Sequence, residues 1–74
     1  MRWNNKKDPL DYGFYTAEDK FYIWHDDTGS CVIYIDEHDK VGMQLLDVHL
    51  IKNVSHETLT KLYNLIKEGV IINE

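Results

Sequence analysis

Three consecutive runs of strand-forming residues dominate the first half of the chain and constrain its fold more than any other feature. Residues 12–17, 20–25 and 31–35 are rich in aromatic and β-branched side chains, which favour extended strands. An acidic pair separates the first two runs, and residues 26–30 separate the second from the third. Short polar turns between such runs predict two β-hairpins in succession and therefore an antiparallel sheet.

The turn residues also predict how the strands are aligned. Asp26 and Gly29 suit a three-residue loop in which the glycine is left-handed. This loop places Tyr22 opposite Tyr34. In the first hairpin, a two-residue loop made of the acidic pair places Tyr15 opposite Tyr22. Because directly opposed residues of an antiparallel pair share a face, the three tyrosines are expected to form one cross-strand row.

The expected alignment sorts the side chains of the sheet onto two faces of different character. The mainly aliphatic face carries Phe14, Phe21, Ile23, Cys31, Ile33 and Ile35. The aromatic face carries Tyr15, Tyr22, Trp24, Val32 and Tyr34. We expect the aliphatic face to form the core, because aliphatic side chains pack densely without polar atoms.

The second half of the chain predicts a further strand, one helix and a short final strand. Apolar residues alternate through 41–45, and the alternation then shifts by one residue after position 46, which indicates a bulge or a break. Ser55 is a suitable N-cap of a helix, and Gly69 a suitable left-handed residue at its C-terminus. The apolar stripe of this helix is expected to comprise Leu59, Leu62, Tyr63, Leu65 and Ile66. Residues 70–72 are all apolar and β-branched, and they predict a short strand.

Together these elements predict an α+β domain in which one helix packs across a small antiparallel sheet of about four strands. The expected order is β-β-β-β-α with a short C-terminal strand. Residues 1–74 are expected to form a single small domain, and residues 1–11 an irregular arm rich in turn-forming residues. Within the arm, Trp3 and Leu10 could dock on the body of the domain.

The charge and hydropathy of the chain restrict its partners. Eight Lys and Arg against thirteen Asp and Glu give a formal net charge of −5, and the longest basic run is Lys6-Lys7. Binding to a phosphate backbone depends on basic clusters, so we expect no direct contact with nucleic acid. No apolar run approaches the ~20 residues of a membrane helix and no leader opens the chain. We therefore expect a cytoplasmic protein without a membrane partner.

No motif in the sequence specifies a reaction. The expected second hairpin places His25 opposite Cys31, which is the only pair that resembles a base and a nucleophile, but both fall on the core face. A buried thiol there is usually a small apolar side chain. The acidic residues that follow His25, and those that flank His38, do not have the spacing of a known metal motif. We therefore predict no catalytic residue, no cofactor and no metal.

The aromatic face is the most informative candidate site. A single helix covers only one face of a sheet, and Tyr and Trp are frequent at the centres of protein interfaces. This favours a non-enzymatic protein-interaction module, a small regulator, inhibitor or adaptor that binds a larger protein or forms a homodimer. The predicted anchors are Tyr15, Tyr22, Trp24 and Tyr34. The alternative is internal cover, in which the arm, through Trp3 and Leu10, or residues 70–72 fold over this face.

The acidic turns support a second hypothesis. Their carboxylates are expected at opposite ends of one strand pair, where turn formation and solubility explain them. Alternatively, they form a surface that mimics DNA and inhibits a nucleic-acid-binding protein. The residues concerned are Asp26, Asp27, Asp36, Glu37 and Asp39. Small acidic domains without catalytic motifs are frequent among regulators encoded by phages and mobile elements, although no residue here carries that association.

Overall fold

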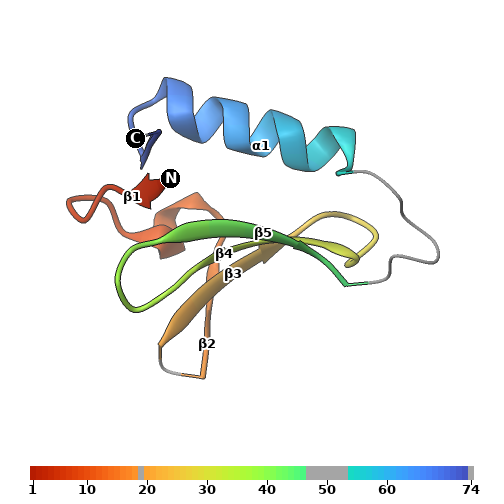
Figure 1. Cartoon of the computed structure of the whole chain (residues 1–74), viewed down its shortest axis with the longest axis horizontal. Coiled ribbons are helices and arrows are strands. Elements are labelled where there is room, and N and C mark those ends of the chain that lie inside the picture. The colour runs from red at the N-terminus through yellow and green to blue at the C-terminus, as the bar shows by residue number, and fades with distance from the viewer. Residues whose placement is uncertain (19, 47–53, 74) are drawn as a thin grey trace.

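The computed structural model describes residues 1–18, 20–46 and 54–73. In chain order its elements are β1 (Arg2–Trp3), the 3₁₀ helix η1 (Pro9–Tyr12), β2 (Tyr15–Ala17), β3 (Phe21–His25), β4 (Cys31–Ile35), β5 (Val41–Leu45), α1 (His56–Lys67) and β6 (Ile71–Ile72). A four-stranded antiparallel sheet has the strand order β2-β3-β4-β5. α1 lies across one face of this sheet (Figure 1). The predicted α+β class, with the helix after the strands of the sheet, is therefore confirmed.

A second, two-stranded sheet brings the N-terminal and C-terminal segments together. β1 pairs with β6 in antiparallel orientation, with Trp3 opposite Ile71, close to the C-terminal end of α1 (Figure 1). Trp3 is 1% exposed, whereas Leu10 is 54% exposed. Residues 1–11 thus contain a strand and most of a 3₁₀ helix instead of an irregular arm, because Trp3 anchors the segment in the core.

Both hairpins are aligned one residue away from the predicted register. In the first hairpin, Tyr15 lies opposite Ile23 instead of Tyr22. In the second, Ile23 and not Tyr22 lies opposite Tyr34. The first loop is longer than predicted because Ala17 pairs with Phe21 and Glu18 adopts a left-handed conformation, with φ of 54°.

The second hairpin differs from the prediction because Asp26 pairs with Cys31, which leaves residues 27–30 in the loop, one more than the predicted three. The backbone N–H of Asp26 donates a hydrogen bond to the Cys31 carbonyl (3.0 Å). Its Oδ1 accepts hydrogen bonds from the Thr28 hydroxyl (2.7 Å) and from the Cys31 N–H (3.4 Å). Gly29 is left-handed as predicted, with φ of 74°, but it lies in a wider loop.

The shift in both registers turns β3 over relative to its neighbours. Tyr22 and Trp24 pack against the core on the α1 side of the sheet, whereas Phe21 and Ile23 face the other side. The buried core consists of Trp3, Phe14, Ile33, Ile35, Val41, Leu62, Leu65, Val70 and Ile71. The predicted sorting of faces is therefore wrong for β3 alone, while β2 and β4 have the predicted orientation. Tyr22 and Trp24 are covered because β3 turns them toward α1; among the described residues, neither terminal segment folds over the face that carries Tyr15, Val32 and Tyr34.

Both ends of α1 lie where the sequence predicts them. The Ser55 hydroxyl accepts a hydrogen bond from the Thr58 N–H (3.2 Å). At the other end Gly69 is left-handed, with φ of 75°, and the Val70 N–H donates to the Leu65 carbonyl (2.9 Å). This bond belongs to a Schellman motif, which satisfies carbonyls that a helix end leaves unpaired.

The buried side of α1 differs from the predicted stripe. Its buried residues are Thr58, Leu62 and Leu65. Its exposed apolar residues are Leu59, Tyr63 and Ile66, at 52%, 63% and 37% of their surface. The prediction is wrong for these three because the apolar residues of α1 cover a wide arc, and packing on the sheet selects one part of it. The shift in alternation expected after residue 46 lies outside the described residues.

Lys61 takes part in the contact between α1 and the sheet. Its Nζ lies 5.9 Å from the centre of the Phe14 ring and 5.7 Å from that of the Trp24 ring, and it donates a hydrogen bond to the Tyr12 carbonyl. Burial lowers the pKa of Lys61, while the carboxylate of Glu68 acts in the opposite direction. The carbonyl and the faces of the two rings replace part of the water that the ammonium group loses. Trp24 is thereby held against α1.

Candidate protein-interaction surface

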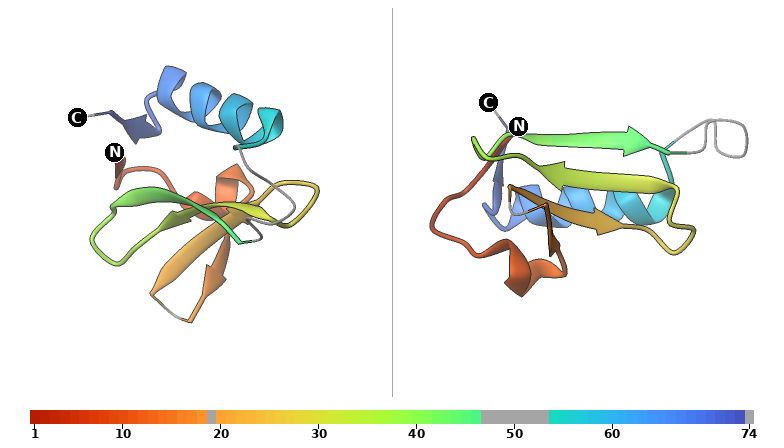
Figure 2. Two further views of the ribbon diagram at one scale, coloured as in Figure 1. Left: turned by 45° about the vertical axis from the view of Figure 1, so that its right-hand side comes forward. Right: turned by 90° about the horizontal axis from the view of Figure 1, so that it is seen from below.

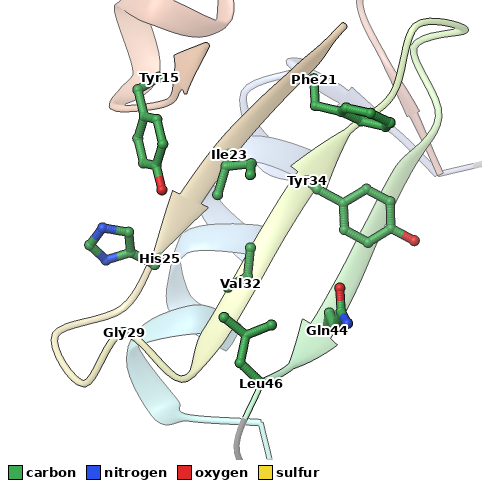
Figure 3. Close-up of a pocket in the computed structure, with 9 residues that line it drawn as sticks. All are labelled: Tyr15, Phe21, Ile23, His25, Gly29, Val32, Tyr34, Gln44 and Leu46. Atoms are coloured by element: carbon green, nitrogen blue, oxygen red, sulfur yellow. The ribbon is translucent and has the colours of Figure 1, made fainter. Parts of the chain in front are cut away.

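The side of the four-stranded sheet away from α1, which we call the open face, has no cover among the described residues. Viewed from this side, α1 lies behind β3 and β4, and no described element crosses in front of these strands (Figure 2, right). A cavity of about 370 Å³ is formed here. It is lined by Tyr15, Phe21, Ile23, His25, Gly29, Val32, Tyr34, Gln44 and Leu46 (Figure 3).

The centre of the open face is apolar. Tyr15, Ile23 and Tyr34 lie opposite one another on successive strands, because Tyr15 pairs with Ile23 and Ile23 pairs with Tyr34. Val32 is only 6% exposed although it points away from α1, because larger side chains surround it. The sheet therefore offers an apolar floor with taller side chains around it.

Tyr34 owes its position to a glycine on the neighbouring strand. Gly42 lies directly opposite Tyr34 in the β4–β5 pair. A Cβ atom at position 42 would overlap with Oη and Cζ of Tyr34, so only glycine lets the ring lie across β5 (Figure 3). An aromatic ring over a strand glycine also covers the backbone that the missing side chain leaves bare. The tyrosine extends the open face to the edge of the sheet.

His25 adds one polar group at the rim of the cavity. Its ring meets that of Tyr15 edge to face, with centroids 5.9 Å apart and an interplanar angle of 69°. Its Nδ1 lies 3.1 Å from the Asp26 carbonyl oxygen. A carbonyl only accepts hydrogen bonds, so Nδ1 is the donor in this contact.

The structure does not bring His25 and Cys31 together. His25 lies opposite Val32, so that it faces the open side, whereas Cys31 is 0% exposed on the α1 side. The predicted opposition of these two residues is wrong, and the pair cannot act as a base and a nucleophile in this arrangement.

The open face contains two of the four predicted aromatic anchors. Tyr15 and Tyr34 lie on it, and Tyr22 and Trp24 lie on the other side of β3. Sequence reasoning missed the contributions of Phe21, Ile23, His25, Gln44 and Leu46 to this face. The alternation of residues 21–25 does not show which set faces the core, since both alternating sets consist mainly of aromatic or aliphatic side chains. The lengths of the two loops decide it.

Asp26 and Asp27, one of the two predicted acidic groups, lie beside the N-terminus of α1. Asp26 is 3% exposed. Burial of the carboxyl raises its pKa, but the hydroxyls of Thr28 and Ser55 and the Cys31 N–H outweigh this, and the net pKa is lowered. Asp27 is exposed, and its N–H donates to Oε1 of Glu57 (2.7 Å). Asp26 thus stabilises the hairpin from inside, and its carboxylate is not displayed.

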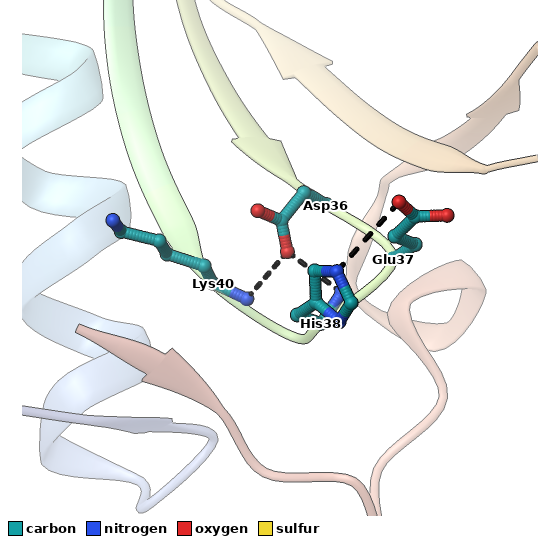
Figure 4. Close-up of polar contacts among 4 residues, drawn as sticks. All are labelled: Asp36, Glu37, His38 and Lys40. Atoms are coloured by element: carbon teal, nitrogen blue, oxygen red, sulfur yellow. Dashed lines mark hydrogen bonds and ion pairs between the residues drawn. The ribbon is translucent and has the colours of Figure 1, made fainter.

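The other acidic group shapes the turn between β4 and β5. Oδ1 of Asp36 accepts hydrogen bonds from the N–H groups of Lys40 (2.9 Å) and His38 (2.8 Å), and these bonds lower the pKa of Asp36 (Figure 4). Glu37 forms an exposed ion pair with His38 (3.7 Å). Asp39 is left-handed, with φ of 63°. This hairpin has the three-residue loop that the sequence predicts for residues 26–30.

The two acidic groups lie at opposite ends of the β3–β4 pair, as predicted, and form no continuous acidic surface. Within residues 1–18, 20–46 and 54–73, no three His, Cys, Asp or Glu residues come together as a metal site would require. No described helix combines the length and the apolar character needed to cross a membrane.

No protein-family model, curated protein or solved structure matches this chain.

Proposed function

We propose that this protein is a non-enzymatic interaction module of the cytoplasm, a small regulator, inhibitor or adaptor, that binds another protein through its open face. The observation that carries the proposal is the apolar character of this face. Where one side of an antiparallel sheet faces water, its side chains are commonly polar. Here the outward positions of β3 and β4 include Phe21, Ile23, Val32 and Tyr34, and none of the described residues that line the cavity carries a formal charge.

The chemistry of the open face suits a protein partner. α1 provides a second layer on one side of the sheet, and the other side lacks one among the described residues. A partner that inserts an apolar side chain into the cavity would supply that layer. The tyrosines and His25 provide polar atoms at the rim, which is the arrangement of an apolar centre with a polar border seen in protein interfaces. Direct binding of nucleic acid is disfavoured by the net charge of −5.

The alternative, an acidic mimic of DNA, has less support. Asp26 is buried and Asp36 is engaged by backbone N–H groups, so that each has a role in a turn. If this alternative were correct, neutralising Asp27, Glu37 and Asp39 would slow association with a basic protein and flatten its salt dependence.

The proposal is tested with substitutions on the two opposite sides of the molecule. Phe21→Ser and Tyr34→Ser alter the open face, and Tyr63→Ser, at a residue 63% exposed on the outer side of α1, is the matched control. Wild-type protein is used to isolate a binding protein from its own cells, and the dissociation constant of the purified pair is then measured for each variant. Circular dichroism confirms that each variant is folded.

The expected result is a loss of affinity of at least ~10-fold for each open-face variant, as for residues at the centre of an interface, and little change for Tyr63→Ser. Equal affinities for wild type and both folded open-face variants would contradict the proposal. A loss confined to Tyr63→Ser would place the interface on α1 instead.

A further inference from the structure

β5 is an edge of the four-stranded sheet, and the direction of its backbone groups follows from two hydrogen bonds. The Leu46 N–H donates to the Ser30 carbonyl (2.7 Å), and the Lys40 carbonyl accepts from the Asp36 N–H (3.0 Å). Both residues lie next to β5 and have even numbers. Along an antiparallel strand, successive residues direct their backbone N–H and carbonyl groups to opposite sides. Gly42 and Gln44 therefore also direct these groups toward β4, and the odd-numbered residues of β5 direct theirs outward.

The outward backbone groups of β5 are only partly paired. The Val41 N–H donates to the Met1 carbonyl (3.1 Å), so the N-terminal segment closes the first part of this edge. No described residue pairs with Met43 or Leu45 on the same side. Within the described part of the chain, two consecutive outward positions therefore each have an N–H and a carbonyl to offer to another strand.

β5 also lacks the features by which edge strands usually avoid further pairing. Residues 41–46 include no charged residue and no proline. Met43 and Leu46 are apolar and 39% and 59% exposed. The opposite edge, β2, is only three residues long and is followed directly by Glu18. β5 is therefore the longer of the two edges and, among the described residues, the less protected one.

We infer that β5 pairs with β5 of a second copy of this chain, antiparallel, around a twofold axis at Gln44. In this register Met43 of each copy lies opposite Leu45 of the other, and the outward N–H and carbonyl groups of both residues are paired. The two Gln44 side chains meet at the axis. An amide has donors and an acceptor, so two identical amides can bond to each other, whereas two like charges would repel.

The charge of the chain bears on where two copies can meet. Two molecules with a net charge of −5 repel each other, and the uncharged edge is where they can approach at least cost. Because directly opposed residues share a face, the two open faces would lie next to each other on one side of a continuous sheet. The inference concerns the edge of the sheet, which shares Gln44 with the lining of the cavity, and it does not depend on the proposed function.

Solution mass by light scattering, measured over a range of protein concentrations, tests the inference. We expect wild type to approach the mass of a dimer above roughly 100 μM, since such a short interface belongs to the weak class. Met43→Pro removes one outward N–H while sparing the bonds to β4, and proline is tolerated on such an edge. We expect it to be a folded monomer. Met43→Val keeps the N–H and is expected to dimerise like wild type, as is Phe21→Ser on the open face.

Two further measurements keep the inference falsifiable if Met43→Pro does not fold. Hydrogen exchange of the Met43 and Leu45 amides in wild type should slow as the concentration rises, with little change at other exposed amides. Added salt should strengthen the dimer, because it screens the repulsion between acidic chains. A wild type that stays monomeric at every concentration, or a dimer whose Met43 and Leu45 amides gain no protection, would overturn the inference.

Discussion

The contact between Tyr34 and Gly42 leads to a prediction whose sign depends on a second residue. In a strand, Gly→Ala normally stabilises a protein by ~0.4–1 kcal/mol, because alanine reduces the freedom of the unfolded chain. At Gly42 the added Cβ would overlap with the ring of Tyr34, which would have to leave its place across β5. Forcing extra atoms into a packed site costs about 1–3 kcal/mol. We therefore expect Gly42→Ala to destabilise the wild-type protein by up to roughly 2 kcal/mol.

The same substitution should act in the opposite direction once the ring is removed. In a Tyr34→Ala background the overlap is absent, so Gly42→Ala should stabilise by about 0.5 kcal/mol. The expected coupling between the two positions is thus ~1–3 kcal/mol, measured by urea unfolding of wild type, both single variants and the double variant. If Gly42→Ala raised the free energy of unfolding equally in both backgrounds, Tyr34 would not lie over Gly42 and our description of the open face would be wrong.

Three further predictions concern other parts of the fold. Trp3→Ala should lower the free energy of unfolding by about 3–5 kcal/mol, measured by heat or urea, because Trp3 is 1% exposed and its ring meets those of Tyr12 and Phe14. Leu10→Ala, at an exposed site in the same segment, should lower it by less than ~0.5 kcal/mol. Equal effects of the two substitutions would contradict the placement of β1. Glu18→Gly should stabilise by roughly 0.5 kcal/mol, since a left-handed conformation is strained for glutamate and not for glycine, and a loss of stability would refute the assigned turn. The lowered pKa of Asp36 means that its carboxylate stabilises the fold above the unfolded pKa, near 3.8, and that this contribution is lost as pH falls through the folded pKa. Asp36→Asn should therefore be less stable than wild type at pH 7, with a difference that shrinks in acid; a difference that persists at low pH would exclude this cause.

The ends of α1 could be predicted because capping depends on local chemistry. Ser55 and Gly69 act within a few residues of the helix, through a hydroxyl and a left-handed backbone. The inward side of α1 depends on the surface that it meets. Lys61 points toward the rings of Phe14 and Trp24, and no helical periodicity would place a lysine there.

The orientation of β3 could not be predicted because its sequence satisfies either phase. Phe21 and Ile23 are as apolar as Tyr22 and Trp24, so a slip of one residue exchanges two acceptable faces. The choice is made in the loops, by the left-handed backbone of Glu18 and by the hydrogen bonds of Asp26. These details depend on side-chain geometry more than on composition.

The pairing of β1 with β6 has no local signal at all. Each strand is two residues long, and they come from opposite ends of the chain. Their pairing follows from the burial of Trp3, Val70 and Ile71 in one cluster. The sequence shows apolar residues at both ends, but only the folded chain shows that they cover the α1 side of the sheet and leave the open face without cover among the described residues.

The central claim is that β3 turns Trp24 toward α1 and presents Ile23 on the open face, and nuclear Overhauser effects from the Trp24 indole ring test it most directly. The account predicts effects between this ring and the side chain of Lys61, whose Nζ is 5.7 Å from its centre, and between the ring and Gly13. Effects from the indole ring to Tyr34 and Val32 would place Trp24 on the open face, restore the register expected from the sequence, and contradict the account.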